Sequence, residues 1–321
     1  MSEKSLIGRI RKLAAGGSAT ARLGIGDDCA ILRVPSGHET LTTTDFSLEG
    51  VHFRRDWHPP ASVGHRCLTR GLSDIAAMGG DPIAAFLSLA LPKNLAQSWV
   101  DGFLKGFLAL ANRFKVTLAG GDLAESPAGI LADVVVIGAA PKGQAILRSG
   151  ARQGDLIYVT GTLGDSAAAL DLLLSGPRRK LRPGDFPAHF YPEPRIAVGR
   201  SLRRKASAMI DVSDGLSTDL THICEESGVG AEVEASRIPR ERQFGETASN
   251  HVSLDLALHG GDDYELIFTA APETRIQSRV AGVAITQIGR IVRGKRVFLT
   301  DQSGRRVRTL EPRGWEHFKK H

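Results

Sequence analysis

The sequence has no run of 18 or more apolar residues, and hydrophobic residues make up an ordinary 42% of its 321 positions. A transmembrane helix needs about 20 consecutive, mostly apolar residues, so we expect no membrane span. The segment Met1–Gly17 also has no continuous apolar stretch of the kind that a secretory signal carries. These absences predict a cytoplasmic protein that does not bind a membrane.

Cysteine is scarce, with three residues that lie far apart in the sequence: Cys29, Cys67 and Cys224. No Cys-x-x-Cys pair occurs, so neither a disulfide framework nor a zinc site is expected. We expect all three to be buried free thiols.

The usual nucleotide-binding and hydrolase motifs are absent as well. There is no Gly-x-Gly-x-x-Gly, no protein-kinase catalytic loop and no Gly-x-Ser-x-Gly elbow. Residues Gly289–Lys295 have the spacing of a phosphate-binding P-loop, but Arg296 occupies the position of the required Ser or Thr. A β-prone segment follows where the P-loop needs a helix, so these residues predict a hairpin turn.

The net charge of +6 and the pI of about 9.4 raise the hypothesis of a nucleic-acid-binding protein. Residues 141–210 alone carry 12 Lys/Arg against 5 Asp/Glu, mainly in short runs at 178–182 and 203–205. Such runs are usually solvated helix ends or loops, and no aromatic residues that would stack on bases are interleaved with them. We therefore expect no nucleic-acid partner.

Helix-like and strand-like segments alternate along the chain, which predicts an α/β or α+β fold. Helices are expected at 4–15, 61–79, 95–114, 164–175, 194–204, 216–227 and around 247–258. Strands are expected at 29–32, 39–46, 83–91, 116–119, 130–139, 155–160, 207–211, 230–235, 264–269, 284–292 and 296–300. The chain is long enough for two domains, and the polar segment Pro141–Gln144 predicts a boundary between domains at 1–140 and 141–321.

The segment Thr42–Phe53 contains a β-prone run that ends on Asp45, followed by Gly50 and His52. An acid at a strand end is often turn chemistry. Thr hydroxyls and Asp carboxylates are also the oxygen ligands that Mg²⁺ takes from proteins. The segment therefore predicts either a turn or part of a metal site.

Other acids share this style, since each lies within or beside Gly, Ser or Thr: Asp27, Asp28, Asp45, Asp74, Asp122, Asp211, Asp214, Asp262 and Asp263. Taken singly, each also fits a turn residue or a helix cap. Most of them fall at predicted strand ends or strand–helix junctions, where α/β folds place their sites. Gathered carboxylates repel one another unless divalent cations lie among them, so the set predicts several Mg²⁺ ions and polyphosphate chemistry.

Eight segments carry a family resemblance: Gly24–Ala30, Thr43–Asp45 with Glu49–Phe53, Leu72–Gly79, Gly120–Asp122, Arg148–Ala151, Tyr158–Ser166, Ile210–Leu216 and Gly260–Leu266. In order along nearly the whole chain, they resemble the thiamine-monophosphate kinase family, within the aminoimidazole ribonucleotide synthetase-like superfamily. The resemblance implies the two-domain α/β (α+β) fold of that superfamily. Its N-terminal strands would form a barrel with a second subunit in a homodimer, and its C-terminal domain would be α/β.

The resemblance also implies an activity, the ATP-dependent phosphorylation of thiamine monophosphate to thiamine diphosphate. The implied Mg²⁺ ligands are Asp28, Thr43, Thr44, Asp45, Asp74, Asp122, Asp211 and Asp214. The implied ATP contacts are Gly121, Asp122, Arg148 and Ser213. The implied substrate contacts are His52, Asp262 and Trp315. The family usually has Glu at the position of Asp262, so a shorter side chain has to reach the substrate here.

Direct in-line transfer suits this activity without a catalytic side chain. The second pKa of a phosphate monoester is about 6, so the acceptor is already a dianion at neutral pH and needs no general base. The obstacle is repulsion between two polyanions, which Mg²⁺ and Arg148 would relieve. We therefore expect no phosphoenzyme intermediate.

Structural roles compete with three of these contacts. His52 also fits a packed core histidine, Arg148 a surface ion pair, and Trp315 a side chain that seals the C-terminus. The segment Gly161–Ser166 predicts a helix start rather than a phosphate loop. For function, the alternatives are another ATP-using enzyme of the same superfamily and a basic nucleic-acid-binding protein, whose binding would fall steeply with salt.

Overall fold

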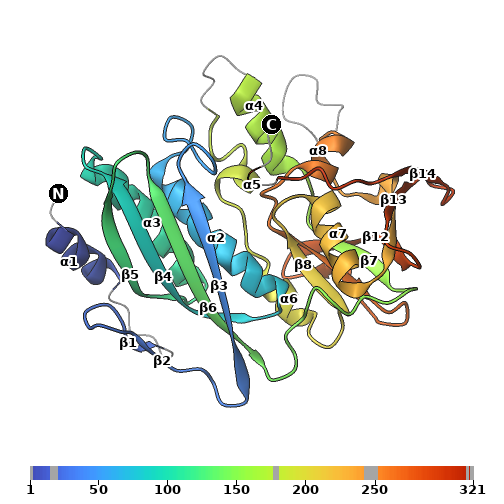
Figure 1. Ribbon diagram of the computed structural model, residues 1–321, viewed down its shortest axis with the longest axis horizontal. Helices are drawn as coiled ribbons and strands as arrows, with labels where there is room; N and C mark the ends of the chain where they lie inside the picture. The colour runs from blue at the N-terminus through green and yellow to red at the C-terminus, as the bar shows by residue number, and fades with distance from the viewer. Residues whose placement is uncertain (1–2, 15–20, 176–180, 242–251, 316–317, 319–321) are drawn as a thin grey trace. The chain divides into compact units, whose positions relative to one another are not determined.

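The computed structural model describes residues 3–14, 21–175, 181–241, 252–315 and 318, which form two compact units (Figure 1). Unit 1 comprises the described residues up to Ile75 together with Gly80–Gly143. Unit 2 comprises Ala76–Gly79 together with the described residues from Gln144 onward. Each unit combines helices with a sheet, which confirms the predicted mixed α/β class.

Unit 1 is built on an open four-stranded sheet in the order β3-β6-β4-β5. The strands are β3 (His38–Leu48), β4 (Asp81–Pro92), β5 (Thr117–Ser126) and β6 (Leu131–Pro141). Strand β6 is antiparallel to both of its neighbours, whereas β4 and β5 are parallel. Alternate residues of β6, including Val134 and Val136, are buried, and those between them are partly exposed. One face of the sheet therefore packs on the core.

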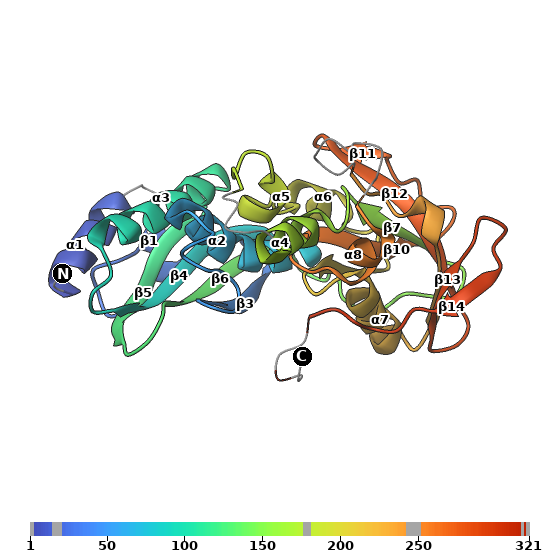
Figure 2. The ribbon, with the colours of Figure 1, turned by 90° about the horizontal axis from the view of Figure 1, so that it is seen from above.

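Two long helices, α2 (Pro60–Ala77) and α3 (Gln97–Arg113), cover the same side of this sheet, as Figure 2 shows. They approach closely at two glycines. A Cβ atom at Gly64 would lie 2.0 Å from the carbonyl oxygen of Phe103, and one at Gly106 would lie 1.8 Å from that of Ala61. Only glycine fits at either position. The other elements of unit 1 are α1 (Glu3–Leu13), β1 (Ala21–Leu23) and β2 (Ile31–Leu32).

Unit 2 contains an eight-stranded sheet in the order β14-β13-β9-β12-β7-β10-β8, with β11 paired to β12. Its strands are β7 (Leu156–Thr160), β8 (Ala208–Val212), β9 (Gly230–Glu234), β10 (Glu265–Ala270), β11 (Arg279–Val280), β12 (Val283–Val292), β13 (Val297–Thr300) and β14 (Arg306–Thr309). All neighbours are antiparallel except β9 and β13.

The helices of unit 2 are α4 (Asp165–Ser175), α5 (Pro187–Phe190), α6 (Ile196–Ser201), α7 (Leu216–Ser227), the 3₁₀ helix η1 (Ala235–Arg237) and α8 (Leu254–His259). Helix α7 supplies Leu216, Leu220 and Ile223 to the main core, where they join alternate residues of the sheet such as Val212 and Val233. This packing fixes the N-terminal turn of α7 at the end of strand β8.

Three local predictions were wrong. The segment after Gly289 is not a hairpin turn, because β9 lies between β12 and β13 and pairs with both. Cys29 is an exposed free thiol, whereas Cys67 and Cys224 are buried as expected. Strand β3 continues to Leu48 and does not end at residue 46, because β6 provides a pairing partner for each of its residues.

Two further predictions concern the membrane and a helix. No helix among the described ranges is long and apolar enough to cross a membrane. The helix expected around 247–258 begins at Leu254, and residues 242–251 lie outside the described part of the chain.

Candidate functional site

An acidic loop follows the fully buried strand β8 in unit 2. It contains Ser213 and Asp214, directly after Asp211 and Val212 at the end of the strand, and it ends at Gly215, the residue before helix α7. The backbone N–H groups of Asp214 and Gly215 donate to one carboxylate oxygen of Asp219, at 3.1 and 2.9 Å. Asp219 is buried, and buried polar groups are normally paired, so these two hydrogen bonds hold the loop against the first turn of α7.

The sequence analysis missed Asp219. An acid in the first turn of a helix that follows Asp-x-Ser-Asp-Gly was the available signal, because such an acid can accept the N–H groups at a helix start. Burial, followed by the negative charges of Asp211 and Asp214, raises the pKa of Asp219 well above its ordinary value. Asp211 of β8, Asp214 of the loop and Asp219 of α7 thus place three carboxylates near the end of one strand.

The segment Gly260–Glu265 lies beside this loop. The N–H of Asp262 donates to the carbonyl oxygen of Ser213, and that of Tyr264 donates to Val212, each at 2.8 Å. Asp262 and Tyr264 both have positive φ angles, +64° and +52°, which are uncommon for an Asp and a genuine outlier for a Tyr. The Tyr264 hydroxyl donates to the Asp262 carboxylate at 2.6 Å and so fixes its direction.

The chain returns to the same loop near its C-terminus. The N–H of Trp315 donates to the carbonyl oxygen of Asp214 at 3.2 Å, and the side chain of Trp315 is 43% exposed. The structure therefore gathers four residues named by the sequence analysis: Ser213, Asp214, Asp262 and Trp315.

Unit 1 gathers a second group, on the face of β3 that looks towards α2. The Thr43 hydroxyl donates to the carboxylate of Asp74 in α2. Asp45 shares this face, since side chains alternate along a strand. Thr44 points to the opposite face, where its hydroxyl donates to Asp133 at 2.8 Å. The alternation thus separates Thr44 from Thr43 and Asp45.

Residue His52 follows β3 in a tight turn and is only partly buried, so it is not a core histidine. The N–H of Leu48 donates to Nδ1 of His52 at 2.9 Å, and the N–H of His52 donates to the carbonyl oxygen of Leu48. Because Nδ1 accepts, the neutral ring carries its proton on Nε2. His52 is therefore held as a hydrogen-bond donor.

A cavity of about 770 Å³ in unit 1 brings together Asp28, Gly121 and Asp122. Gly121 has a φ of +151°, and a Cβ atom there would lie 1.8 Å from the carbonyl oxygen of Leu87, so only glycine fits. Arg11 of helix α1 also lines this cavity and was missed by the sequence analysis. It is a cation in a cavity that is also lined by three acids, Asp27, Asp28 and Asp122.

Comparisons with known proteins agree along the whole chain. Residues 26–140 match the AIR synthase related protein, N-terminal domain, and residues 152–302 match the AIR synthase related protein, C-terminal domain. The thiamine-monophosphate kinase of Escherichia coli (strain K12) is 38% identical over 331 aligned positions, which cover 98% of each chain. The chain belongs to the thiamine-monophosphate kinase family.

Solved structures of related proteins have the same fold as this chain. The thiamine-monophosphate kinase from Stenotrophomonas maltophilia K279a has a TM-score of 0.80 and 36% identity, and the match covers 93% of this chain and 96% of that one. A structure described as AaThiL complexed with AMPPCP and TMP has a TM-score of 0.76 and 33% identity, and the match covers 98% of this chain and 97% of that one. These matches confirm the predicted two-domain fold.

Arg148 lies apart from the Ser213 group within unit 2. Its carbonyl oxygen accepts from the hydroxyl of Ser227 at 3.3 Å, at the C-terminal end of helix α7. Ser213 precedes the N-terminal end of the same helix, whose 12 residues span about 18 Å. The backbone of Arg148 is therefore about one helix length away from Trp315.

No three His, Cys, Asp or Glu side chains in the described part of the chain are arranged as a ready-made metal site. Thr43, Asp45 and Asp74 lie in unit 1, as do Asp28 and Asp122, whereas Asp211 and Asp214 lie in unit 2. Few protein oxygens at each place suit Mg²⁺, which usually keeps several waters and takes one or two carboxylates together with substrate phosphates.

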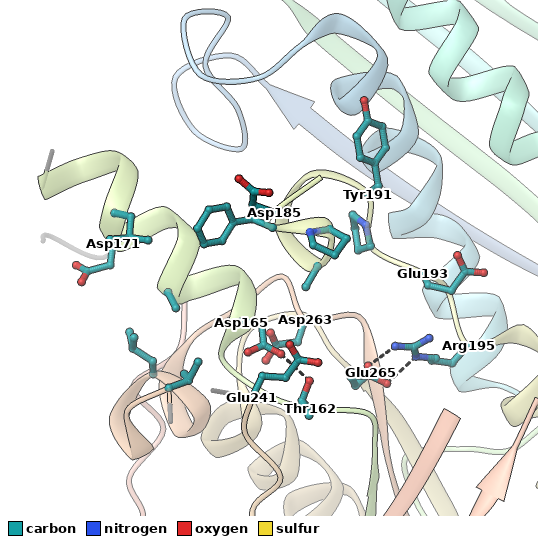
Figure 3. Close-up of a pocket in the computed structure, with 18 residues that line it drawn as sticks. Thr162, Asp165, Asp171, Asp185, Tyr191, Glu193, Arg195, Glu241, Asp263 and Glu265 are labelled. Carbon is teal, nitrogen blue, oxygen red and sulfur yellow. Dashed lines mark hydrogen bonds and ion pairs between the residues drawn. The ribbon is translucent and has the colours of Figure 1, made fainter. Parts of the chain in front are cut away.

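A separate cavity of about 360 Å³ lies in unit 2, where the carboxylates of Asp165, Glu241 and Asp263 point towards one another (Figure 3). Burial raises the pKa of Asp165 to about 6, and it raises the pKa of Asp263 further above its ordinary value. At the other end of this cavity, Arg195 forms a bidentate ion pair with Glu265. Asp165 begins helix α4, which confirms the predicted helix start.

Proposed function

We propose that this protein transfers the terminal phosphoryl group of ATP to thiamine monophosphate and so makes thiamine diphosphate. The similarity to thiamine-monophosphate kinases over 98% of both chains carries this proposal. The related structure with AMPPCP and TMP supports both substrates, since AMPPCP is an ATP analogue with a methylene group in place of the β–γ bridging oxygen.

The Asp262 and Trp315 pair suits the thiamine half of the substrate. Thiamine carries a cationic thiazolium ring and a flat pyrimidine ring. An exposed indole provides a face for ring stacking and for a cation, and the neighbouring carboxylate adds a negative charge. His52, with its proton on Nε2, would donate to an oxygen of the substrate phosphate.

The nucleotide would contact Gly121, Asp122, Arg148 and Ser213. Gly121 lines the cavity of unit 1 beside Asp122, and its lack of a side chain allows β5 to pack closely against Leu87 of β4. The guanidinium of Arg148 would neutralise phosphate charge. These residues position the donor and reduce the repulsion between donor and acceptor.

The residues present fit Mg²⁺, because all of the predicted ligands are hydroxyl or carboxylate oxygens. Asp28, Thr43, Thr44, Asp45, Asp74, Asp122, Asp211 and Asp214 would hold the ions. When bound, Mg²⁺ neutralises the negative charge that develops on the transferred phosphoryl group. The chain itself then has to align donor and acceptor, and transfer proceeds directly, without a phosphoenzyme.

We also propose a homodimer that acts in the cytoplasm, where ATP is supplied. The open sheet of unit 1 supports the dimer. Phe46 on β3 is 56% exposed, and Phe86 and Val135 on the neighbouring strands are only partly buried. A second copy of this sheet would cover these apolar side chains, and light scattering at several protein concentrations would measure the resulting mass.

The decisive experiment is turnover of thiamine monophosphate with Mg²⁺-ATP, followed by chromatographic detection of thiamine diphosphate. The wild type should form the product, and Asp45→Ala and Asp122→Ala should lose most of the activity while they stay folded. Absence of product from the wild type would overturn the proposal, and formation of aminoimidazole ribonucleotide would support the superfamily alternative. A stable phosphoprotein formed with ATP alone would contradict direct transfer.

A further inference from the structure

The segment Arg313–Trp315 lies along the first turn of helix α7. Three successive backbone N–H groups of this segment donate hydrogen bonds. Those of Arg313 and Gly314 donate to the Ser217 and Thr218 hydroxyls in the first turn, at 3.4 and 3.0 Å. That of Trp315 donates to the carbonyl oxygen of Asp214, just before the helix, at 3.2 Å. The side chain of Leu310, just before this segment, is 2% exposed and belongs to the main core. Residues 310–315, called the tail below, are therefore anchored in the core at Leu310 and bonded to α7 and its preceding loop at Arg313–Trp315.

Docking requires glycine at position 314. A Cβ atom there would lie 2.0 Å from the carbonyl oxygen of Asp214 and 2.6 Å from the hydroxyl oxygen of Thr218. Real Cβ atoms do not approach backbone oxygens so closely, so any side chain at 314 would move the tail away from α7. The acceptor of the Trp315 N–H is the same Asp214 oxygen, so this displacement would also move Trp315.

The two hydroxyl acceptors are not equivalent. The Ser217 hydroxyl lies 2.9 Å from Nδ1 of His259, and its contact with Arg313 is the longest of the three. The Thr218 hydroxyl makes the shorter bond, to the residue adjacent to Trp315. Thr218 is therefore the side chain on which the position of Trp315 depends most directly.

We propose that Thr218 and Gly314 are positioning residues that set the affinity for the thiamine moiety by holding Trp315 beside Asp214 and Asp262. This inference rests on the proposed function for the role of Trp315. Neither residue belongs to the proposed nucleotide contacts. Their replacement should therefore weaken binding of thiamine monophosphate and leave the Michaelis constant for ATP unchanged.

The test uses the full-length protein with four variants. Thr218→Val removes the hydroxyl at constant shape, Thr218→Ser keeps it, and Gly314→Ala adds the excluded methyl group. Gly184→Ala is the matched control, because nothing lies within 4 Å of the added atom. Amide hydrogen exchange of Gly314 and Trp315, read by mass spectrometry, reports docking without reference to activity.

We expect exchange at these two amides to be about 5-fold faster in Thr218→Val and Gly314→Ala, since a hydrogen bond contributes about 1 kcal/mol. The Michaelis constant for thiamine monophosphate should rise about 10-fold, with kcat and the constant for ATP within about 2-fold. Thr218→Ser and Gly184→Ala should match the wild type in both measurements.

Unchanged exchange in Thr218→Val and Gly314→Ala would overturn the docking contact. Faster exchange with an unchanged Michaelis constant for thiamine monophosphate would overturn the role of Trp315 as the positioned group. A wild type that makes no thiamine diphosphate would overturn the proposed function and with it the affinity claim, while the exchange data would still decide whether the tail docks.

Discussion

The hydroxyl of Thr43 donates a hydrogen bond to the carboxylate of Asp74, which joins strand β3 to helix α2 within unit 1. Earlier in helix α2, the side chain of Cys67 lies within hydrogen-bonding reach of Ser47, and the negative charge of Asp45 acts on its thiol. Thr43, Asp45 and Ser47, which share one face of β3, thus lie along helix α2 between Asp74 and Cys67. The carboxylates of Asp45 and Asp74 belong to one interface between a strand and a helix.

Replacement of Asp74 by Asn tests whether this carboxylate serves the reaction through its charge. Asn keeps an oxygen that can accept from Thr43, so the fold should persist and the melting temperature should change by only a few degrees. If Asp74 holds Mg²⁺, kcat should fall by about 100-fold or more, because the charge that attracts the ion is lost. Turnover measured over a range of Mg²⁺ concentrations checks this prediction.

The matched control is Asp133→Asn, because Asp133 accepts from Thr44 on the opposite face of the same sheet. Its activity should stay within about 3-fold of the wild type. Equal losses of activity in the two variants would show that the role of an acid does not depend on which face of the sheet it lies on.

Replacement of Tyr264 by Phe tests the direction of the Asp262 carboxylate. Tyr264 is almost fully buried, and its hydroxyl donates to Asp262. Loss of a hydrogen bond to a charged group costs about 1.5 to 3 kcal/mol. We expect the Michaelis constant for thiamine monophosphate to rise about 10-fold. Tyr158→Phe, at a ring stacked on Phe268, should leave it unchanged, and equal effects would argue against a specific bond.

The ion pair between Arg195 and Glu265 should dominate the stability of unit 2 among single charge changes. Glu265 is buried, and the side chain of Arg195 is only 17% exposed. Glu265→Gln leaves a largely buried guanidinium without its charge partner, which should cost about 3 kcal/mol in urea denaturation. Asp56→Asn in the exposed Arg54–Asp56 pair should cost far less, because solvent screens an exposed ion pair. A larger loss in the exposed pair would reverse this ranking.

Asp165 should make stability depend on pH. Burial raises its pKa in the folded protein to about 6 from an ordinary value of 3.8, so the folded state favours the protonated carboxyl. That stabilisation is complete below pH 3.8 and is lost as the pH rises through 6. Asp165→Asn removes the charge, and it should stabilise the protein by about 1 to 2 kcal/mol at pH 7.5, a figure reduced for the partial exposure of the side chain.

At pH 4.5 the gain from Asp165→Asn should largely disappear, since the wild-type residue is then protonated. Thermal unfolding at both pH values measures the difference. Asp171→Asn, at an exposed residue of the same helix, serves as the control. A gain of equal size at pH 4.5 and 7.5 would show that ionisation of Asp165 is not its cause.

Periodic segments of the fold were predictable because their own residues determine them. Helices α2 and α3 carry apolar stripes such as Leu68, Leu72, Phe103 and Phe107, all of which are buried. Strand β3 shows where local pattern fails. Its C-terminal half is polar, yet it continues to Leu48 because β6 supplies the pairing groups from about 90 residues further along the chain.

The arrangement of the candidate site could not be predicted from the sequence. The association of Trp315 with Asp214 depends on a hydroxyl and a glycine that are 96 positions apart in sequence. The positive φ angle of Tyr264 opposes its own preference and persists because the segment is bonded to Val212 and Ser213. Asp219 carried a sequence signal as an acid in the first turn of a helix, but its burial and its bonds to the acidic loop depend on the folded arrangement.

The insertion of β9 between β12 and β13 imposes an order on folding. Strands that are adjacent in sequence usually pair early and locally, but β12 and β13 can reach their places only on either side of residues 230–234, which come some 50 residues earlier. Such non-local pairing slows folding. A chain that stops before Val297, whether a truncated product or a nascent chain on the ribosome, exposes the unpaired edge of β9 to other strands. The segment Val297–Trp315 therefore covers the edge of β9 as well as placing the N–H of Trp315 at Asp214.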